Sequence, residues 1–214
     1  MIFAYLGDIH ASRHQTAGRK TDLDEAVSAT RLAISISTAD NPMSTTLLNN
    51  LGNLLLRRYN NHTSHEDDLH QALEYVLRPG DFLQRKREQK HAPSVLATLG
   101  AIRACLYDRM GDVRDLEEAI LKTRDSIRLA ADSAITTRGT LFNNLGSLLC
   151  RRYQLTGKGE DQDESIVSFV RALECFPEDT REMVTCLINS SLVLTQRYGR
   201  TGQLDDLGSA LHYT

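Results

Sequence analysis

The sequence repeats itself, and this property constrains the fold more than any other. The segment LLNNLGNLLLRRYN at Leu47–Asn60 returns as LFNNLGSLLCRRYQ at Leu141–Gln154, 94 positions later. A weaker copy around Leu99-Gly100 lies between them, so the true period is about half of that spacing. A period of this size is typical of chains that stack one supersecondary unit several times.

Two sets of small residues recur at this interval and give the number of repeats. The first set has successive spacings of 45, 48, 46 and 45 residues, and the second has spacings of 46, 47, 46 and 45. Their agreement predicts five repeats with a period of about 46 residues, approximately 1–40, 41–90, 91–132, 133–177 and 178–214. The first set is Gly7, Gly52, Gly100, Gly146 and Ser191, and the second is Ala26, Ala72, Ala119, Ser165 and Ala210.

Each repeat divides into two segments with helical periodicity. In the first segment Leu48, Leu51 and Leu55 recur at three- and four-residue steps, which is the pattern of one apolar helix stripe. Thr156-Gly157 predicts a helix that ends in a left-handed glycine, and so does Thr201-Gly202. No segment alternates with the period of a strand, so we expect an all-α chain.

Proline and small residues indicate how these helices connect and pair. Asn41-Pro42 and Phe176-Pro177 predict a helix stop followed by a restart with proline in the first turn. Gly52 allows a partner helix to approach closely, with Ala72 as the matching flat surface. A single hairpin would leave an apolar face exposed to solvent, and stacking against neighbouring hairpins would bury that face in a continuous core. This predicts one elongated α-solenoid domain over residues 1–214.

The motif Leu48-x-x-Leu51-Gly52-x-x-Leu55, with Ser165-x-x-x-Phe169-x-x-Ala172 in a second segment, resembles the tetratricopeptide repeat (TPR). The repeat is longer than the usual ~34 residues. Its Leu-Asn-Asn-Leu-Gly and Arg-Arg-Tyr motifs are similar to those in the long repeats of fungal TPR proteins that accompany CHAT or NB-ARC modules, and to kinesin-light-chain repeats. The resemblance covers essentially the whole chain and implies a right-handed superhelix that binds a peptide in its concave groove.

The composition argues against several other classes of protein. The chain is 41% hydrophobic and 25% charged with a net charge of −3, whereas phosphate binding needs a basic face, so we expect no nucleic-acid partner. Asp8 and His10 interrupt the apolar N-terminal residues too early for a signal peptide or a membrane span. The four cysteines contain no CxxC pair, which favours reduced thiols in a cytoplasmic protein.

In TPR arrays the first helix of each pair lines the groove, so this resemblance points to the polar residues of the first segments. An amide both donates and accepts hydrogen bonds and can therefore bind the backbone of an extended peptide, while arginine favours a carboxylate on it. The middle repeat carries Ala97, Thr98 and Ala101 instead, which leaves an apolar gap. The candidate groove residues are Thr46, Asn49, Asn50, Asn53, Arg57, Thr140, Asn143, Asn144, Ser147, Arg151 and Asn189.

A structural interpretation of the same residues stays open. Asn50 and Asn144 are equally well explained as struts that bond to an adjacent repeat, because buried amides are usually satisfied internally. Arg57-Arg58 also fits a solvated face that pairs with nearby acids.

The histidines suggest a metal only weakly. His10 and His14 lie four residues apart on a helix, and His62, His65 and His70 lie among acidic residues. Neither spacing matches a known zinc motif, and we therefore predict no metal and no cofactor.

Two alternatives to peptide binding remain. The chain contains no nucleophile elbow and no phosphate loop, so catalysis would need a cavity, for example one formed by His91, Arg103, Cys105 and Tyr107. The other alternative is a self-associating array or a fragment of a larger signalling protein, because neither end carries a polar capping helix. Homo-oligomers would then form through the exposed ends.

Overall fold

The structure is a computed structural model that describes residues 2–17, 19–37, 44–61, 67–77, 92–130 and 133–212. These residues form ten helices and no strand, which confirms the all-α prediction. Their contacts separate into two compact units, residues 1–111 and residues 112–214. The single elongated domain remains a prediction from the sequence.

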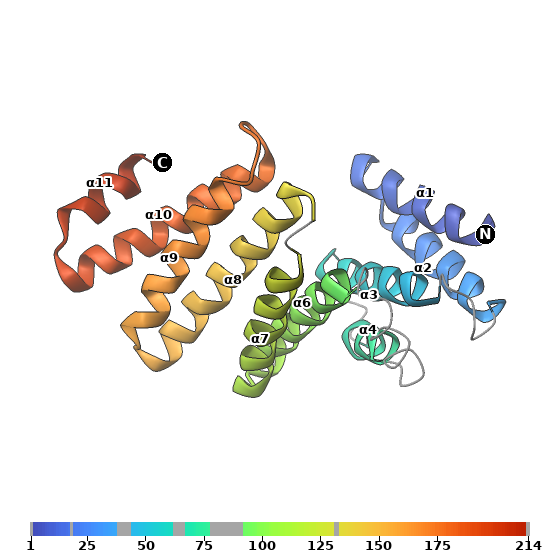
Figure 1. Cartoon of the computed structure of the whole chain (residues 1–214). Helices are drawn as coiled ribbons and strands as arrows, with labels where there is room; N and C mark the ends of the chain where they lie inside the picture. The colour runs from blue at the N-terminus through green and yellow to red at the C-terminus, as the bar shows by residue number, and fades with distance from the viewer. Residues whose placement is uncertain are drawn as a thin grey trace. The chain divides into compact units, whose positions relative to one another are not determined.

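Figure 1 shows the helices in their order along the chain. The first unit contains α1 (Ile2–Ala17), α2 (Lys20–Ser35), α3 (Ser44–Asn61), α4 (Asp68–Val76) and α6 (Ala92–Met110). The second unit contains α7 (Val113–Leu129), α8 (Ile135–Thr156), α9 (Gly159–Leu173), α10 (Arg181–Thr201) and α11 (Leu204–His212). Within the described residues, no helix is both long enough and apolar enough to cross a lipid bilayer.

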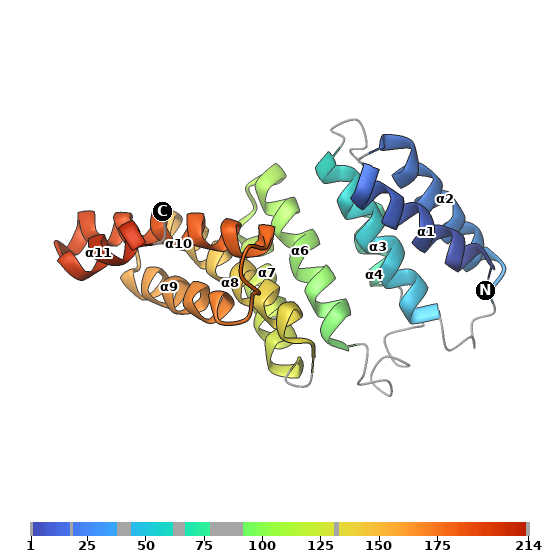
Figure 2. The ribbon, with the colours of Figure 1, turned by 90° about the horizontal axis from the view of Figure 1, so that it is seen from above.

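In the first unit, consecutive helices pack against one another, and α3 also contacts α6 (Figure 2). The core between them is built from the apolar stripes that the sequence pattern predicts. Leu23, Leu51, Leu55, Leu69 and Ile102 are all completely buried in it.

The second unit repeats this arrangement, with α8 between α7 and α9, and α10 between α9 and α11. Helices α8 and α10 also touch. Phe142, Phe169 and Cys186 lie in the core of this unit, and burial raises the pKa of the Cys186 thiol to about 11. The four cysteines are free.

The helix ends explain the turn residues. Gly157 (φ 68°) and Gly202 (φ 71°) end α8 and α10 in the left-handed conformation, as their sequences predicted. The helix stop predicted at Phe176-Pro177 is confirmed, since α9 ends at Leu173. The predicted place of the proline was wrong: Pro177 lies in the α9–α10 connection and not in the first turn of α10, which the hydroxyl of Thr180 caps by accepting from Met183 N. Because the Thr180 hydroxyl caps the first turn, α10 begins at Arg181, four residues after the proline. Asn41-Pro42 lies outside the described residues.

Small residues let the helices of a pair approach closely. A Cβ added at Gly146 would lie 2.8 Å from ring atoms of Phe169, and Ser165 donates a hydrogen bond of 2.8 Å to the Gly146 carbonyl. Gly52 likewise leaves room for Val76, beside the backbone of Ala72. The small residues therefore act as predicted, although an aromatic ring fills the space at Gly146.

A recurring ion-pair arrangement links three of the hairpins to the preceding helix. Arg58 on α3 donates through Nε and Nη2 to the two carboxylate oxygens of Asp68, both at 2.7 Å, and these bonds raise the pKa of the guanidinium. Its third nitrogen reaches Asp24 on α2 at 3.0 Å. We call this the arginine–aspartate fork. The same fork joins Arg152 to Asp161 and Glu117, and Arg197 to Asp206 and Asp163.

Two repeats depart from the fork. In the first hairpin, Nη2 of Arg13 lies 3.4 Å from Oδ1 of the buried Asp22, and the two short bonds of the fork are not formed to this aspartate. In the middle repeat, the register of the arginine is taken by Leu106, which is buried in the first unit, and the register of the preceding acid by His70. The donor and its acceptor at this junction are therefore both replaced.

Candidate functional site

The candidate groove residues of the first unit lie on α3 and differ in exposure. Thr46, Asn50, Asn53 and Arg57 are half-buried, and Asn49 is buried. Asn53 accepts a hydrogen bond of 3.1 Å from Thr98 on α6, so this amide links two repeats as a strut.

Two polar groups of this row, the side-chain oxygen of Asn49 and the guanidinium of Arg57, lack a partner among the described residues. The side-chain oxygen of Asn49 is buried and has no hydrogen-bond partner among the described residues. Arg57 has no ion-pair partner in the same part of the chain, and partial burial lowers the pKa of its guanidinium. A half-buried cation without an acid beside it is suited to bind a carboxylate from another molecule.

The corresponding residues of the second unit lie on α8 and α10. Asn189 donates to the side-chain oxygen of Asn143 at 3.4 Å, which joins α10 to α8, and Ser147 donates to the Asn143 carbonyl at 3.1 Å. Asn144 and Thr140 are exposed. The exposure of Asn144 leaves its amide accessible to solvent.

Helix α10 carries apolar side chains where α3 and α8 carry amides. Ile188 takes the register of Asn49 and Asn143, and Leu192 takes the register of Asn53. Val184 lies one turn before Ile188. These three side chains are 51%, 61% and 57% exposed in chain order, and form an exposed apolar stripe. The half-buried Asn189 follows Ile188 directly in the sequence, so α10 carries an amide next to this stripe.

A cavity of about 320 Å³ lies at the N-terminal end of α8, entirely within the second unit. The α9–α10 connection forms its apolar wall, and the first turns of α8 and α10 supply its polar groups. A Cβ added at Gly139 would meet Cys175 Cβ at 2.9 Å, so the glycine allows this connection to pack against α8. The lining residues are Thr136, Thr137, Thr140, Phe176, Pro177, Thr180 and Glu182.

The polar lining of this cavity offers acceptors. The hydroxyl proton of Thr140 is used in a bond to the Thr136 carbonyl at 3.1 Å, and that of Thr180 in a bond to the Pro177 carbonyl at 3.0 Å. Lone pairs of these oxygens and the carboxylate of Glu182 are left to accept. A ligand group that donates hydrogen bonds matches these acceptors, and the Glu182 carboxylate adds a negative charge to the lining.

The other candidate residues are not brought together. His14 Nδ1 bonds to the Arg19 carbonyl at 2.9 Å, whereas His10 lies beside Glu25, so the two histidines do not share a site. His62, His65 and His91 lie outside the described residues. Cys105 bonds through its sulfur to the Asn60 oxygen at 3.6 Å.

Sequence reasoning missed the fork and the cavity for different reasons. The arginines and aspartates of the fork recur with the period of the small residues, so the repeat comparison contained a signal for them. The cavity had no such signal, because it depends on the path of the α9–α10 connection around Phe176.

No family model matches this chain, and no curated protein matches it either.

Proposed function

We propose that this chain is a non-catalytic binding scaffold of the TPR-like α-solenoid type, and that its second unit binds an extended peptide along α8 and α10. The observation that carries the proposal is the exposed apolar stripe of Val184, Ile188 and Leu192. Single exposed apolar residues are ordinary on protein surfaces, but three at successive turns of one helix provide area for a partner.

The neighbouring polar groups give such a peptide its register and its preferred chemistry. The exposed amide of Asn144 offers a donor and an acceptor to a peptide backbone. The cavity beside Thr140 suits a lysine or arginine side chain, whose apolar stem would lie on Phe176 and Pro177 while its cationic head reaches Glu182. The proposed ligand therefore combines apolar residues with a basic one.

A display library of random peptides tests this function directly. We expect the wild-type chain to enrich peptides with apolar residues and a lysine or arginine, and Ile188→Glu to weaken binding of the enriched peptides at least about tenfold, since a charge replaces an apolar contact. Val167→Glu is the matched control, because Val167 is exposed to a similar degree, 50%, but lies on α9 and not on α8 or α10. Equal enrichment by wild type and Ile188→Glu would contradict the proposal.

Glu182→Gln separates the cavity from the stripe. We expect this variant to lose the preference for a basic residue while it retains the apolar preference, because it removes only the negative charge of the cavity. An unchanged basic preference would place that recognition elsewhere.

A second candidate function, self-association, is favoured by an observation on α1. Ile2, Tyr5 and Ile9 lie on α1 and are 81%, 68% and 53% exposed, so this helix presents an apolar face. Static light scattering over a series of protein concentrations tests this candidate. We expect the molar mass of the wild type to rise with concentration and that of Tyr5→Glu to stay at the monomer value. A strictly monomeric wild type would exclude this candidate.

A further inference from the structure

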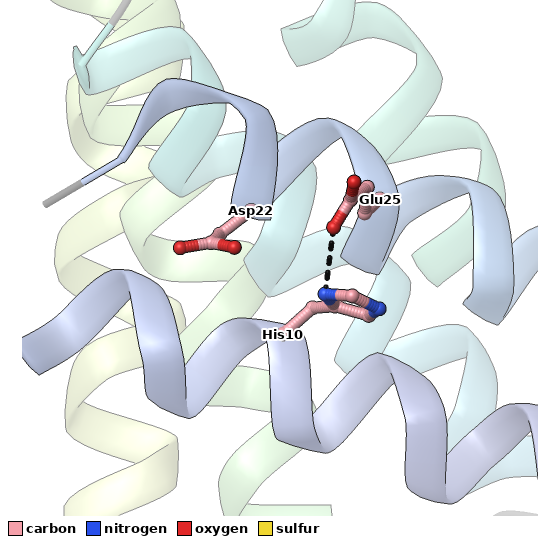
Figure 3. A group of neighbouring side chains, drawn as sticks. All are labelled: His10, Asp22 and Glu25. Atoms are coloured by element: carbon pink, nitrogen blue, oxygen red, sulfur yellow. Dashed lines mark ion pairs between the residues drawn. The ribbon is translucent and has the colours of Figure 1, made fainter. Parts of the chain in front are cut away.

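We propose that His10, Asp22 and Glu25 form a Zn²⁺-binding site between α1 and α2. One ligand atom from each residue lies within 4.8 Å of the others (Figure 3). The site belongs to the first hairpin, and it is independent of the peptide-binding surface proposed for the second unit.

The position of His10 is unusual for its repeat register. Leu55, Leu149 and Leu194 occupy the same register in three other repeats, and all three are buried. The middle repeat has Arg103 at this register. His10 therefore places a ring nitrogen, with a side chain only 14% exposed, where three of the other four repeats place core leucine. An imidazole at such a position needs a polar partner.

The buried aspartate of this hairpin is held less completely than the corresponding aspartates of the forks. In the forks, both oxygens of the corresponding aspartate accept from one arginine, whereas Asp22 has one 3.4 Å contact with Arg13. Asp22 is 1% exposed, and its Oδ2 has no hydrogen-bond partner among the described residues. A buried carboxylate oxygen of this kind calls for a donor or a cation.

Glu25 completes the ligand set. Its Oε2 lies 2.8 Å from Nδ1 of His10, but the groups are not aligned as a hydrogen bond, so Nδ1 is a second buried polar atom without such a partner in the described part of the chain. The Glu25 side chain is 53% exposed, which gives an ion a path from solvent to the buried Asp22.

The donor set selects the metal. One imidazole and two carboxylates are N and O ligands of the type that Zn²⁺ takes, with a fourth position for water. A tetrahedral zinc with bonds of ~2.0 Å holds neighbouring ligand atoms ~3.3 Å apart. The 2.8 Å pair of His10 and Glu25 would therefore open slightly, and any pair near the 4.8 Å limit would close by about 1.5 Å, which side-chain rotation can supply. The two carboxylates outweigh the single positive charge of Arg13 nearby.

Zinc titration of the full chain against a chromophoric chelator tests the site. We expect one Zn²⁺ per chain at the site, a raised thermal midpoint with the metal, and at least about tenfold weaker binding in His10→Leu. This variant carries the residue that other repeats place at the register, so it is expected to fold. Asp22→Asn should weaken binding similarly, with helix content checked by circular dichroism.

His14→Tyr is the matched control, because Tyr59 and Tyr153 occupy its register elsewhere. It should bind Zn²⁺ as the wild type does. The proposal is overturned if the wild type shows no saturable Zn²⁺ binding, or if His10→Leu binds with wild-type affinity and stoichiometry.

Discussion

The hairpins α1–α2 and α8–α9 follow the same repeat register but stabilise their buried aspartate differently. In α8–α9, Arg152 holds both oxygens of Asp161, at 2.6 and 3.0 Å. In α1–α2, Arg13 touches one oxygen of Asp22 at 3.4 Å, and its side chain is 49% exposed. The difference shows two uses of the same aspartate. Where one arginine binds both of its oxygens, the aspartate anchors the hairpin, and where one oxygen has no hydrogen-bond partner, the aspartate is available to bind a cation.

The largest effect that this comparison predicts is the loss of a closed fork. Arg152→Ala leaves Asp161 buried without its counter-charge, and we expect the free energy of unfolding to fall by about 3–5 kcal/mol. Urea unfolding measures this change. Arg114→Ala is the control, because the Arg114 side chain is 91% exposed, and it should change stability by less than about 0.5 kcal/mol. Equal effects of the two variants would show that the fork is not a stabilising anchor.

Close helix packing gives the next largest effect. Gly146→Ala should destabilise by about 1–2 kcal/mol, because the new methyl would overlap the Phe169 ring and overpacking outweighs the gain in helix propensity. The control is Gly199→Ala, since nothing lies within 4 Å of a Cβ added at Gly199. Thermal unfolding should show this control to be stabilised by up to ~1 kcal/mol.

Gly7→Ala extends the packing comparison to the first hairpin. Its new methyl would meet the Thr30 hydroxyl, which can rotate away by giving up its 2.8 Å bond to the Ala26 carbonyl. We therefore expect a smaller loss than for Gly146→Ala. A larger loss would mean that α1–α2 packs as rigidly as α8–α9.

The thiol of Cys186 predicts a pH effect in the second unit. Its folded-state pKa is raised to about 11, mainly by burial. The folded chain therefore binds this proton more tightly than the unfolded chain, so stability is complete below the unfolded-state pKa of the thiol and falls as the pH rises toward about 11. Unfolding midpoints measured between neutral and alkaline pH should fall less steeply in Cys186→Val. Identical slopes would contradict the assignment.

The smallest effect is expected for Arg13→Ala. A half-exposed arginine that lies 3.4 Å from one carboxylate oxygen contributes less than about 1 kcal/mol through that ion pair, so this variant should remain close to the wild type in urea unfolding. A loss as large as that of Arg152→Ala would remove the contrast between the two hairpins.

The sequence predicted the helices well because their signals are local. Apolar residues at three- and four-residue steps, and glycines such as Gly157 and Gly202, depend only on nearby chain. Pro177 was misplaced because the start of α10 depends on the cap at Thr180, and Thr180 lies three residues after the proline. Local composition allowed either start.

The candidate site was predicted less completely, because the sequence pattern indicates which residues lie on a helix face but not which side chains of other helices they contact. Asn53 and Asn143 looked alike as groove amides, yet both are bonded to the next repeat. The pairing of His10 with Glu25 spans two helices, so a search for histidines spaced along one helix pointed to His14 instead. Only the packing of α1 on α2 reveals this pair.

The fork gives the chain a direction. Each arginine holds an aspartate in its own hairpin and reaches back to an acid on the helix before it, as Arg197 does with Asp163 on α9. A hairpin therefore presents a donor toward its predecessor and an acceptor toward its successor. Copies joined head to tail would place each arginine beside an acid of the copy before it. At the junction where Leu106 and His70 replace both members, the described residues offer no such pair.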